Sequence, residues 1–320
     1  MTMANIDDGY PAIGVDSILN ASRNMDVRDM LKLSSKNRAI FKRILEDLEV
    51  LERLKSEAEK KPLDLVSLYC NIRFFLPKGL RESLRKIVAR SIVKFGSRTF
   101  SRISHGARRL LSDQPPGELD IEETIENLLE KGGRLDSLSS DDFRYIKPYS
   151  RRIGVVAILD LSGSMTGLKI SVASVICAVI AFKARFGQYG IVGFDTEPYI
   201  LKQSWKNIPP EVTVEKILDS TTGGYTNITS ALKLARRELR YIKAPRKFAV
   251  LITDGAYNVG GDPRFEASKF RRLHVVGIGS KNGYGGLVCR DIAQMGGGKY
   301  IPASTEFWSV LRAVSYVLSG

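Results

Sequence analysis

Four short aliphatic runs in the second half of the chain limit its fold more than any other feature. They read IGVVAILD (153–160), YGIVGFD (189–195), KFAVLITD (247–254) and LHVVGIG (273–279). Runs of this kind are typical of strands that are buried on both faces of a sheet. Segments with helical spacing of apolar residues accompany them, near 168–185, 226–242, 262–270, 285–294 and 305–318. The alternation predicts an α/β fold: a doubly wound, mostly parallel sheet with helices on both faces, and PYILK at 198–202 as an antiparallel edge strand.

The first half of the chain follows a different pattern. From about residue 27 to residue 112, apolar residues recur at helical spacing, and prolines interrupt them. An acidic segment at 121–133 predicts a further helix that ends at its two glycines. We therefore expect an N-terminal tail (1–26), a mainly helical domain (27–135), a linker (136–151) and the α/β domain (152–320).

Charge is the strongest oddity of the composition, with a formal net charge of +14. Residues 60–112 hold 13 Lys and Arg against two acids, and residues 113–142 hold ten acids against two bases. A basic block of this kind can neutralise phosphates, or it can pair with an acidic segment of the same chain or of a partner protein.

Cysteine usage and hydropathy indicate the compartment. Cys70, Cys177 and Cys289 are isolated from one another in sequence, so they predict reduced core thiols rather than disulfides or a zinc cluster. The N-terminus has no apolar core of a signal peptide, and the most apolar stretch, 170–182, is too short to cross a bilayer of about 30 Å. We expect an intracellular, cytoplasmic protein without a membrane anchor.

Polar oxygen-bearing side chains follow three of the predicted strands or begin the next helix. These residues are Asp160, Ser162, Ser164, Thr226 and Asp254. In open parallel sheets, ligands bind beyond the carboxyl ends of the strands, where all five residues are expected. Oxygen-only ligands suit Mg²⁺, and Mn²⁺ or Ca²⁺ share that preference, whereas Zn²⁺ would require His or Cys. Each hydroxyl taken singly could instead cap a helix, but the set as a whole favours a cation site.

The set resembles a known motif. Asp160-Leu-Ser162-Gly-Ser164, with Thr226 in GGYTN and Asp254 in ITDG, is similar in order and spacing to the complete metal-ion-dependent adhesion site (MIDAS) of von Willebrand factor A (vWA) domains. The resemblance covers about residues 152–320. It implies that the two serines and the threonine contact the metal, that the aspartates act largely through water, and that an acidic side chain of a partner completes the coordination.

The region before the first strand adds a second, looser resemblance. Helices that precede a C-terminal vWA domain are similar to those of CoxE and magnesium-chelatase D-subunit-like proteins, which work beside MoxR-type AAA+ ATPases. This likeness implies an adaptor or co-chaperone, chaperone-like in role, for an AAA+ ATPase. In the glycine-rich stretch 277–286, Lys281 and Tyr284 are candidates for partner contacts beside the metal.

The sequence disfavours two kinds of enzyme active site at the end of the first predicted strand. A P-loop requires GxxxxGK[ST], which does not occur in the sequence. An aspartyl phosphotransferase of the haloacid-dehalogenase type would need an aspartate where Ser162 stands, because serine cannot act as the general acid. We expect no enzymatic activity.

The alternative function is RNA binding, because Ro-like ribonucleoproteins also join a helical domain to a vWA domain. Its support is the basic block, in which Arg85, Lys86, Arg90 and Lys94 are the candidate nucleic-acid contacts. No RRM, KH or zinc-finger signature accompanies them.

Overall fold

The computed structural model describes residues 26–36, 41, 44–45, 47–60, 62–108, 118–119, 125, 145–146, 153–165, 168–184, 187–220, 223–279 and 283–304. The predicted helix at 305–318 lies outside these residues, as does all but Ile125 of the predicted acidic helix.

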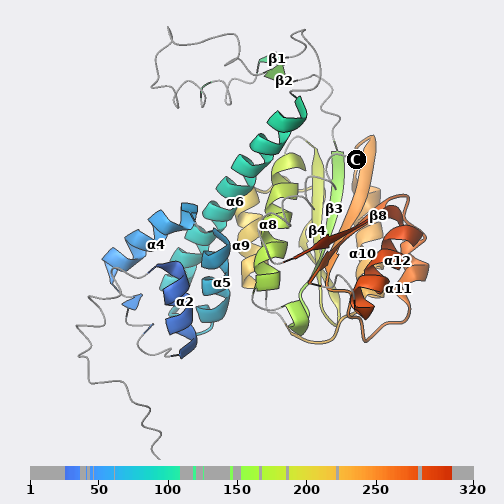
Figure 1. Cartoon of the computed structure of the whole chain (residues 1–320). Coiled ribbons are helices and arrows are strands. Elements are labelled where there is room, and N and C mark those ends of the chain that lie inside the picture. The colour runs from blue at the N-terminus through green and yellow to red at the C-terminus, as the bar shows by residue number, and fades with distance from the viewer. Residues whose placement is uncertain are drawn as a thin grey trace, which may run out of the picture.

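A six-stranded sheet forms the centre of the molecule (Figure 1). Its strands are β3 (Ile153–Asp160), β4 (Gln188–Phe194), β5 (Pro198–Lys202), β6 (Arg246–Thr253), β7 (Leu273–Ile278) and β8 (Gly297–Ala303). They lie in the order β5-β4-β3-β6-β7-β8, and every neighbouring pair is parallel except β4 and β5. The predicted fold class, including the antiparallel edge strand, is therefore confirmed.

Helices cover both faces of this sheet (Figure 1). They are α8 (Leu168–Lys183), α9 (Pro210–Asp219), α10 (Ile228–Tyr241), α11 (Pro263–Ala267) and α12 (Tyr284–Met295). Alternate residues of β3 enter different cores: Val155 packs with α8 and α9, and Val156 packs with α10 and α12. Helix α9 and strand β8 were not predicted, whereas the four other predicted helices that fall in the described residues are present.

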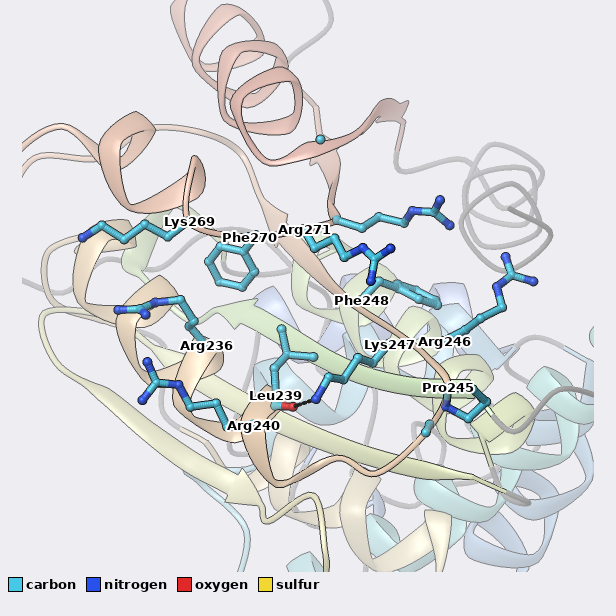
Figure 2. Close-up of a pocket in the computed structure, with 13 residues that line it drawn as sticks. Arg236, Leu239, Arg240, Pro245, Arg246, Lys247, Phe248, Lys269, Phe270 and Arg271 are labelled. Carbon is cyan, nitrogen blue, oxygen red and sulfur yellow. Dashed lines mark hydrogen bonds between the residues drawn. The ribbon is translucent and has the colours of Figure 1, made fainter.

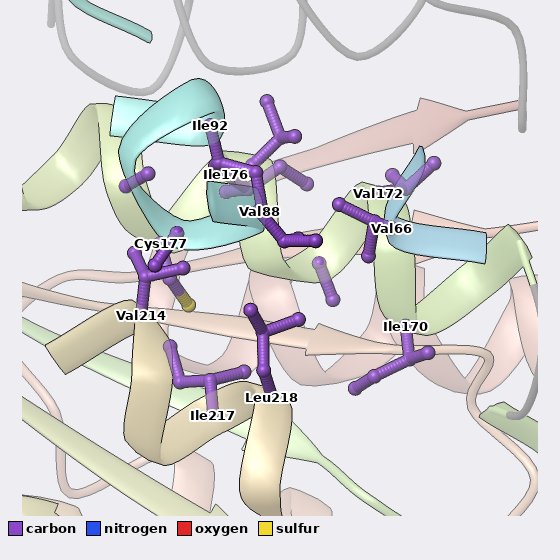
Figure 3. Packing of buried hydrophobic residues seen from close by; sticks show 14 of the residues in the cluster. Val66, Val88, Ile92, Ile170, Val172, Ile176, Cys177, Val214, Ile217 and Leu218 are labelled. Atoms are coloured by element: carbon purple, nitrogen blue, oxygen red, sulfur yellow. The ribbon is translucent and has the colours of Figure 1, made fainter. Parts of the chain in front are cut away.

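In the described residues before the sheet there are four helices: α2 (Val27–Lys36), α4 (Leu48–Lys60), α5 (Pro62–Ile72) and α6 (Lys78–Arg108). Helix α8 is apolar on all sides because it lies between the sheet and these helices. Val88 and Ile92 of α6 pack in one cluster with Ile176 of α8 (Figure 3). These four helices therefore share the hydrophobic core that lies on the α8 and α9 face of the sheet.

Several smaller features bear on the sequence predictions. Strands β1 (Glu118–Leu119) and β2 (Tyr145–Ile146) pair with each other in a short antiparallel ladder. The three cysteines are free thiols, and Cys177 and Cys289 are buried. Among the helices that the structure describes, none is both long and apolar enough to cross a membrane.

Candidate metal centre

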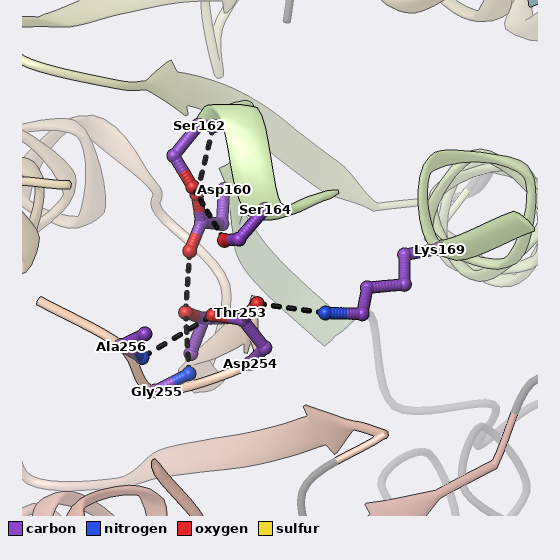
Figure 4. Close-up of polar contacts among 8 residues, drawn as sticks. All are labelled: Asp160, Ser162, Ser164, Lys169, Thr253, Asp254, Gly255 and Ala256. Atoms are coloured by element: carbon purple, nitrogen blue, oxygen red, sulfur yellow. Dashed lines mark hydrogen bonds and ion pairs between the residues drawn. The ribbon is translucent and has the colours of Figure 1, made fainter. Parts of the chain in front are cut away.

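The carboxylate of Asp160 ends the central strand β3 and is fully buried. Its Oδ1 accepts hydrogen bonds from the Ser162 backbone N–H at 2.9 Å and from the Ser162 hydroxyl at 2.6 Å. Its Oδ2 accepts from the Thr253 hydroxyl at 2.5 Å, from the end of the neighbouring strand β6 (Figure 4). The side chain is thereby fixed between two parallel strand ends.

The loop after β3 brings two hydroxyls beside this carboxylate. A 3₁₀ turn, η3 (Gly163–Met165), follows Ser162, and the Oγ atoms of Ser162 and Ser164 lie 3.2 Å apart. Nothing occupies the space where a side chain on Gly163 would begin, so close packing does not require glycine there. The two serines face the same point, as the DxSxS spacing predicts.

Asp254 supplies the second carboxylate, directly after β6. The Ala256 N–H donates to its Oδ1 at 3.2 Å, and the Lys169 ammonium lies 2.8 Å from its Oδ2. Gly255 follows with φ of +79°, and a Cβ there would lie 2.2 Å from the backbone oxygen of Gly285. Only glycine fits this turn, which holds Asp254 at the sheet edge.

The two carboxylates differ in their electrostatics. Burial, and to a smaller extent the charge of Asp254, raises the pKa of Asp160 to about 6, although the hydrogen bonds from Ser162 and Thr253 act to lower it. Burial alone would also raise the pKa of Asp254, but Lys169, Ser164 and the Ala256 N–H together bring that pKa below its usual value. The site therefore carries negative charge that a cation would stabilise.

Thr226 lies on a neighbouring loop just before α10 and is only 4% exposed. Its backbone N–H donates to Asn258 Oδ1 at 2.8 Å, and its carbonyl accepts from the Asn258 N–H at 3.2 Å. Asn227 caps α10 by accepting from the Ser230 N–H, and its own N–H donates to the Asp195 carbonyl. Within the described residues the Thr226 hydroxyl makes no hydrogen bond, so it stays available as a ligand.

The donor set fits a hard cation. Two carboxylates and three hydroxyls are oxygen ligands, which Mg²⁺ prefers. In the part of the chain that the structure describes, no group of three His, Cys, Asp or Glu side chains could hold a metal, so any binding here depends on the hydroxyls. His274 lies in β7, near the opposite end of the sheet, apart from this set as expected from the sequence.

Two residues of this cluster, Thr253 and Lys169, were not predicted from the sequence. Thr253 precedes the predicted Asp254 and reads as one more strand residue, although its hydroxyl fixes Asp160. Lys169 stands in the first turn of α8 and reads as a helix-flanking charge. A search for polar residues on both sides of each strand end would have found Thr253, but no sequence signal gives the direction of the Lys169 side chain.

Of the two residues predicted to contact a partner, the structure describes Tyr284. Tyr284 begins α12 and is 65% exposed, and its influence raises the pKa of Tyr257. Tyr225, beside Thr226, is 61% exposed. Lys281 lies outside the described residues.

The predicted nucleic-acid contacts all lie on α6, but they differ in their surroundings. The Arg85 guanidinium pairs with Glu215 at 3.1 Å and with Asp219, both on α9. The side chains of Lys86, Arg90 and Lys94 are exposed. Arg85 therefore joins α6 to α9, and its guanidinium is already occupied by carboxylates.

Comparison with known families gives one match. Residues 88–277 match the family model described as "VWA domain containing CoxE-like protein". The matched range begins inside α6, so it includes part of the helix that packs on α8 and α9 as well as most of the sheet. No curated protein matches the chain.

Solved structures with similarity to the chain include three bacterial proteins. BatB from Bacteroides thetaiotaomicron is 20% identical, with a TM-score of 0.43, over 52% of this chain and 97% of that one. The PilB minor pilin from Streptococcus sanguinis is 18% identical, with a TM-score of 0.44, over 55% and 63%. A von Willebrand factor type A protein from Catenulispora acidiphila is 18% identical, with a TM-score of 0.44, over 52% and 42%.

Proposed function

Because the chain belongs to the family of CoxE-like proteins that contain a VWA domain, we propose that it is a metal-dependent protein–protein interaction module. The observation that carries the proposal is the cluster at the carboxyl edge of the sheet, in which hydrogen bonds join Asp160, Ser162 and Ser164, and the charge of Asp254 acts on Asp160. Such a cluster is preorganised because Thr253 and the backbone N–H groups hold the carboxylates before any ligand arrives.

The residues that would hold Mg²⁺ are Ser162, Ser164 and Thr226 directly, with Asp160 and Asp254 beside them. When bound, the cation supplies a positive charge with an open coordination position for a carboxylate of the partner. The chain's own residues orient this position: Ser162 and Ser164 set the direction of the hydroxyls, and Asn258 fixes the backbone of Thr226. Three neutral ligands leave the cation electrophilic, so the partner contributes an exposed Asp or Glu.

The surface around this position fits a protein partner. Tyr225, in the loop before α10, and Tyr284, at the start of α12, are exposed. Tyrosines of this kind supply large contact areas at protein interfaces. The resemblance to CoxE and magnesium-chelatase D-subunit-like proteins makes a MoxR-type AAA+ ATPase the expected partner, with this chain as its adaptor or co-chaperone.

Binding rather than catalysis suits the groups at the site. The Ser162 hydroxyl donates to a carboxylate that already accepts two other hydrogen bonds, so it is a fixed ligand rather than an activated nucleophile. The Ro-like alternative receives less support, because Arg85 pairs with Glu215 and Asp219 instead of facing a ligand.

The test is affinity capture of the partner ATPase by the full chain, with Mg²⁺ and with EDTA. We expect capture by the wild type with Mg²⁺ only, and no capture by the variant Ser162→Ala/Ser164→Ala in either buffer. The matched control is Ser268→Ala, because Ser268 is exposed and its hydroxyl donates to the Phe265 carbonyl of its own chain segment. Circular dichroism checks that each variant is folded. Equal recovery in every lane would rule out the adhesion-site mechanism.

A metal titration tests the first step without a partner. Mg²⁺ should raise the melting temperature of the wild type, since a ligand at a hundredfold excess over its Kd stabilises the native state by about 2.7 kcal/mol. The double serine variant should not respond to Mg²⁺.

A further inference from the structure

A basic recess lies at the end of the sheet opposite the candidate metal centre (Figure 2). It is formed by the end of α10, the start of β6 and the segment before β7, and its volume is about 440 Å³. Seven of its thirteen lining residues are Lys or Arg, and none is Asp or Glu. A strand such as β6 therefore begins at a cationic surface and ends at an anionic one.

Three of the seven cations have a structural role. Arg236 and Lys269 both pair with the buried Glu266, at 3.0 Å and 2.7 Å. The Lys247 ammonium donates to the carbonyls of Leu239 and Ile242, both at 3.0 Å, and so completes the C-terminal end of α10. These three residues explain only part of the positive charge.

Arg240 and Arg271 have no such role. Both are exposed, and neither makes an ion pair or a side-chain hydrogen bond within the part of the chain that the structure describes. Figure 2 shows Arg240 projecting from α10 on one side of the recess and Arg271 lying beside Phe248 on the other. Arg246 and Arg272 add two further positive charges to the same lining.

His274, whose ring packs edge-on against Phe248 of the recess, is a buried imidazole. His274 is 4% exposed, and burial, followed by the charges of Arg272 and Lys299, lowers its pKa to about 4. A neutral His274 adds no charge of its own, so the potential in the recess comes from the arginines and lysines. Like charges held together at a surface destabilise the fold unless an anion compensates them.

The shape and chemistry of the recess indicate the class of anion. Arginine offers a planar fork of N–H donors that matches phosphate oxygens. The floor includes Phe248 and Phe270, but these rings are only 6% and 8% exposed and offer little surface for stacking a base. Recognition here therefore depends on charge rather than on the bases of a nucleic acid.

We propose that this recess binds the phosphate groups of a polyanionic ligand, through Arg240 and Arg271. Two kinds of ligand carry such phosphate groups: a free oligophosphate and a single-stranded nucleic acid, through its sugar-phosphate backbone. The site is separate from the adhesion site, and it differs from the basic block on α6, because all of its residues follow residue 235.

The test measures binding of two probes, inorganic tripolyphosphate by calorimetry and a fluorescent short oligouridylate by anisotropy. Both titrations use the full chain in EDTA, so that the metal centre does not contribute. The variant Arg240→Gln/Arg271→Gln should weaken binding by about tenfold or more. The control Lys233→Gln/Arg237→Gln removes the same charge from exposed positions of α10 outside the recess, and we expect less than about a twofold effect.

The outcomes separate the sources. Binding of tripolyphosphate alone supports a free oligophosphate ligand, and binding of both probes supports a backbone ligand. Three results would overturn the proposal: neither probe binds, the recess and control variants weaken binding equally, or polyglutamate of matched charge binds as tightly as the phosphate probes.

Discussion

The ammonium group of Lys169 lies 2.8 Å from Oδ2 of Asp254, one of the residues proposed to hold the cation. The Asp254 side chain is 8% exposed and that of Lys169 is 30% exposed, so water screens this pair only in part. A fixed positive charge here competes with a divalent cation for the same carboxylate. We therefore expect Lys169 to stabilise the metal-free site and to lower the affinity of the proposed site for a cation.

Replacement of Lys169 tests this competition. In Lys169→Gln we expect Mg²⁺ to bind more tightly by about tenfold, because removal of one repelling charge is worth about 1 kcal/mol or slightly more at a partly exposed site. In EDTA the same variant should be less stable than the wild type by up to about 1 kcal/mol, because Asp254 loses its partner. Calorimetric Mg²⁺ titration and thermal unfolding measure the two effects, with the exposed Lys233→Gln as control. Weaker Mg²⁺ binding would mean that Lys169 organises Asp254 for the metal instead.

The sequence was most informative for those site residues that follow a strand end. Asp160, Ser162 and Asp254 were predictable, because continuous apolar runs mark where the strands end and parallel strands end at one edge. The ion pair of Lys169 was not predictable, because it depends on the rotation of α8 over that edge. The approach of Arg240 to Arg271 in the recess was not predictable for the same reason, since these two residues come from segments that only the fold brings together.

At the scale of the elements, helix α9 and strand β8 were not predicted from the sequence. Helix α9 carries Val214, Ile217 and Leu218 at helical spacing after two prolines, but a single short apolar stripe of this length does not distinguish a helix from a loop. Strand β8 reads GGKYIPA, in which the glycines and the proline disfavour a strand. The strand forms because its backbone pairs in parallel with β7, so this tertiary pairing overrides the local propensity of the sequence.

Besides apolar packing, one arginine joins α6 to α9 through ion pairs. Arg85 pairs with Glu215 at 3.1 Å and with Asp219, and all but about a fifth of the Arg85 and Glu215 side chains is buried. We expect Arg85→Ala to lower the free energy of unfolding by roughly 1–2 kcal/mol, because it leaves Glu215 without its partner. The exposed Lys86→Ala should change it by less than about 0.5 kcal/mol.

A double-mutant cycle isolates the pair. Chemical denaturation of Arg85→Ala, Glu215→Ala and the double variant should give a coupling energy of about 1 kcal/mol. A coupling energy near zero would mean that Arg85 acts only through packing.

At the scale of the whole molecule, the helices before the sheet and the sheet itself are joined by apolar contact. Ser67 of α5 also hydrogen-bonds to Ser171 of α8 at 3.0 Å in a buried position. Residue Gly96 of α6 packs so closely that a Cβ there would lie 3.2 Å from the Val179 side chain of α8. Separation of the two regions would expose α8, which is apolar on all sides. We therefore expect one cooperative unfolding unit rather than two.

The tryptophans allow a direct test of that cooperativity, because Trp205 and Trp308 both follow residue 152 and neither lies in the helices before the sheet. Ile92 of α6 is fully buried, and Ile92→Ala should lower the free energy of unfolding by about 2–5 kcal/mol through lost burial and a residual cavity. In a shared core, tryptophan fluorescence must report the full loss, with the same midpoint as far-UV circular dichroism. The exposed Val212→Ala on α9 is the control, with a change below about 0.5 kcal/mol. If the fluorescence transition stays at its wild-type midpoint while circular dichroism shows an earlier one, the helices unfold separately, and loss of their packing leaves intact the sheet that carries the candidate metal centre.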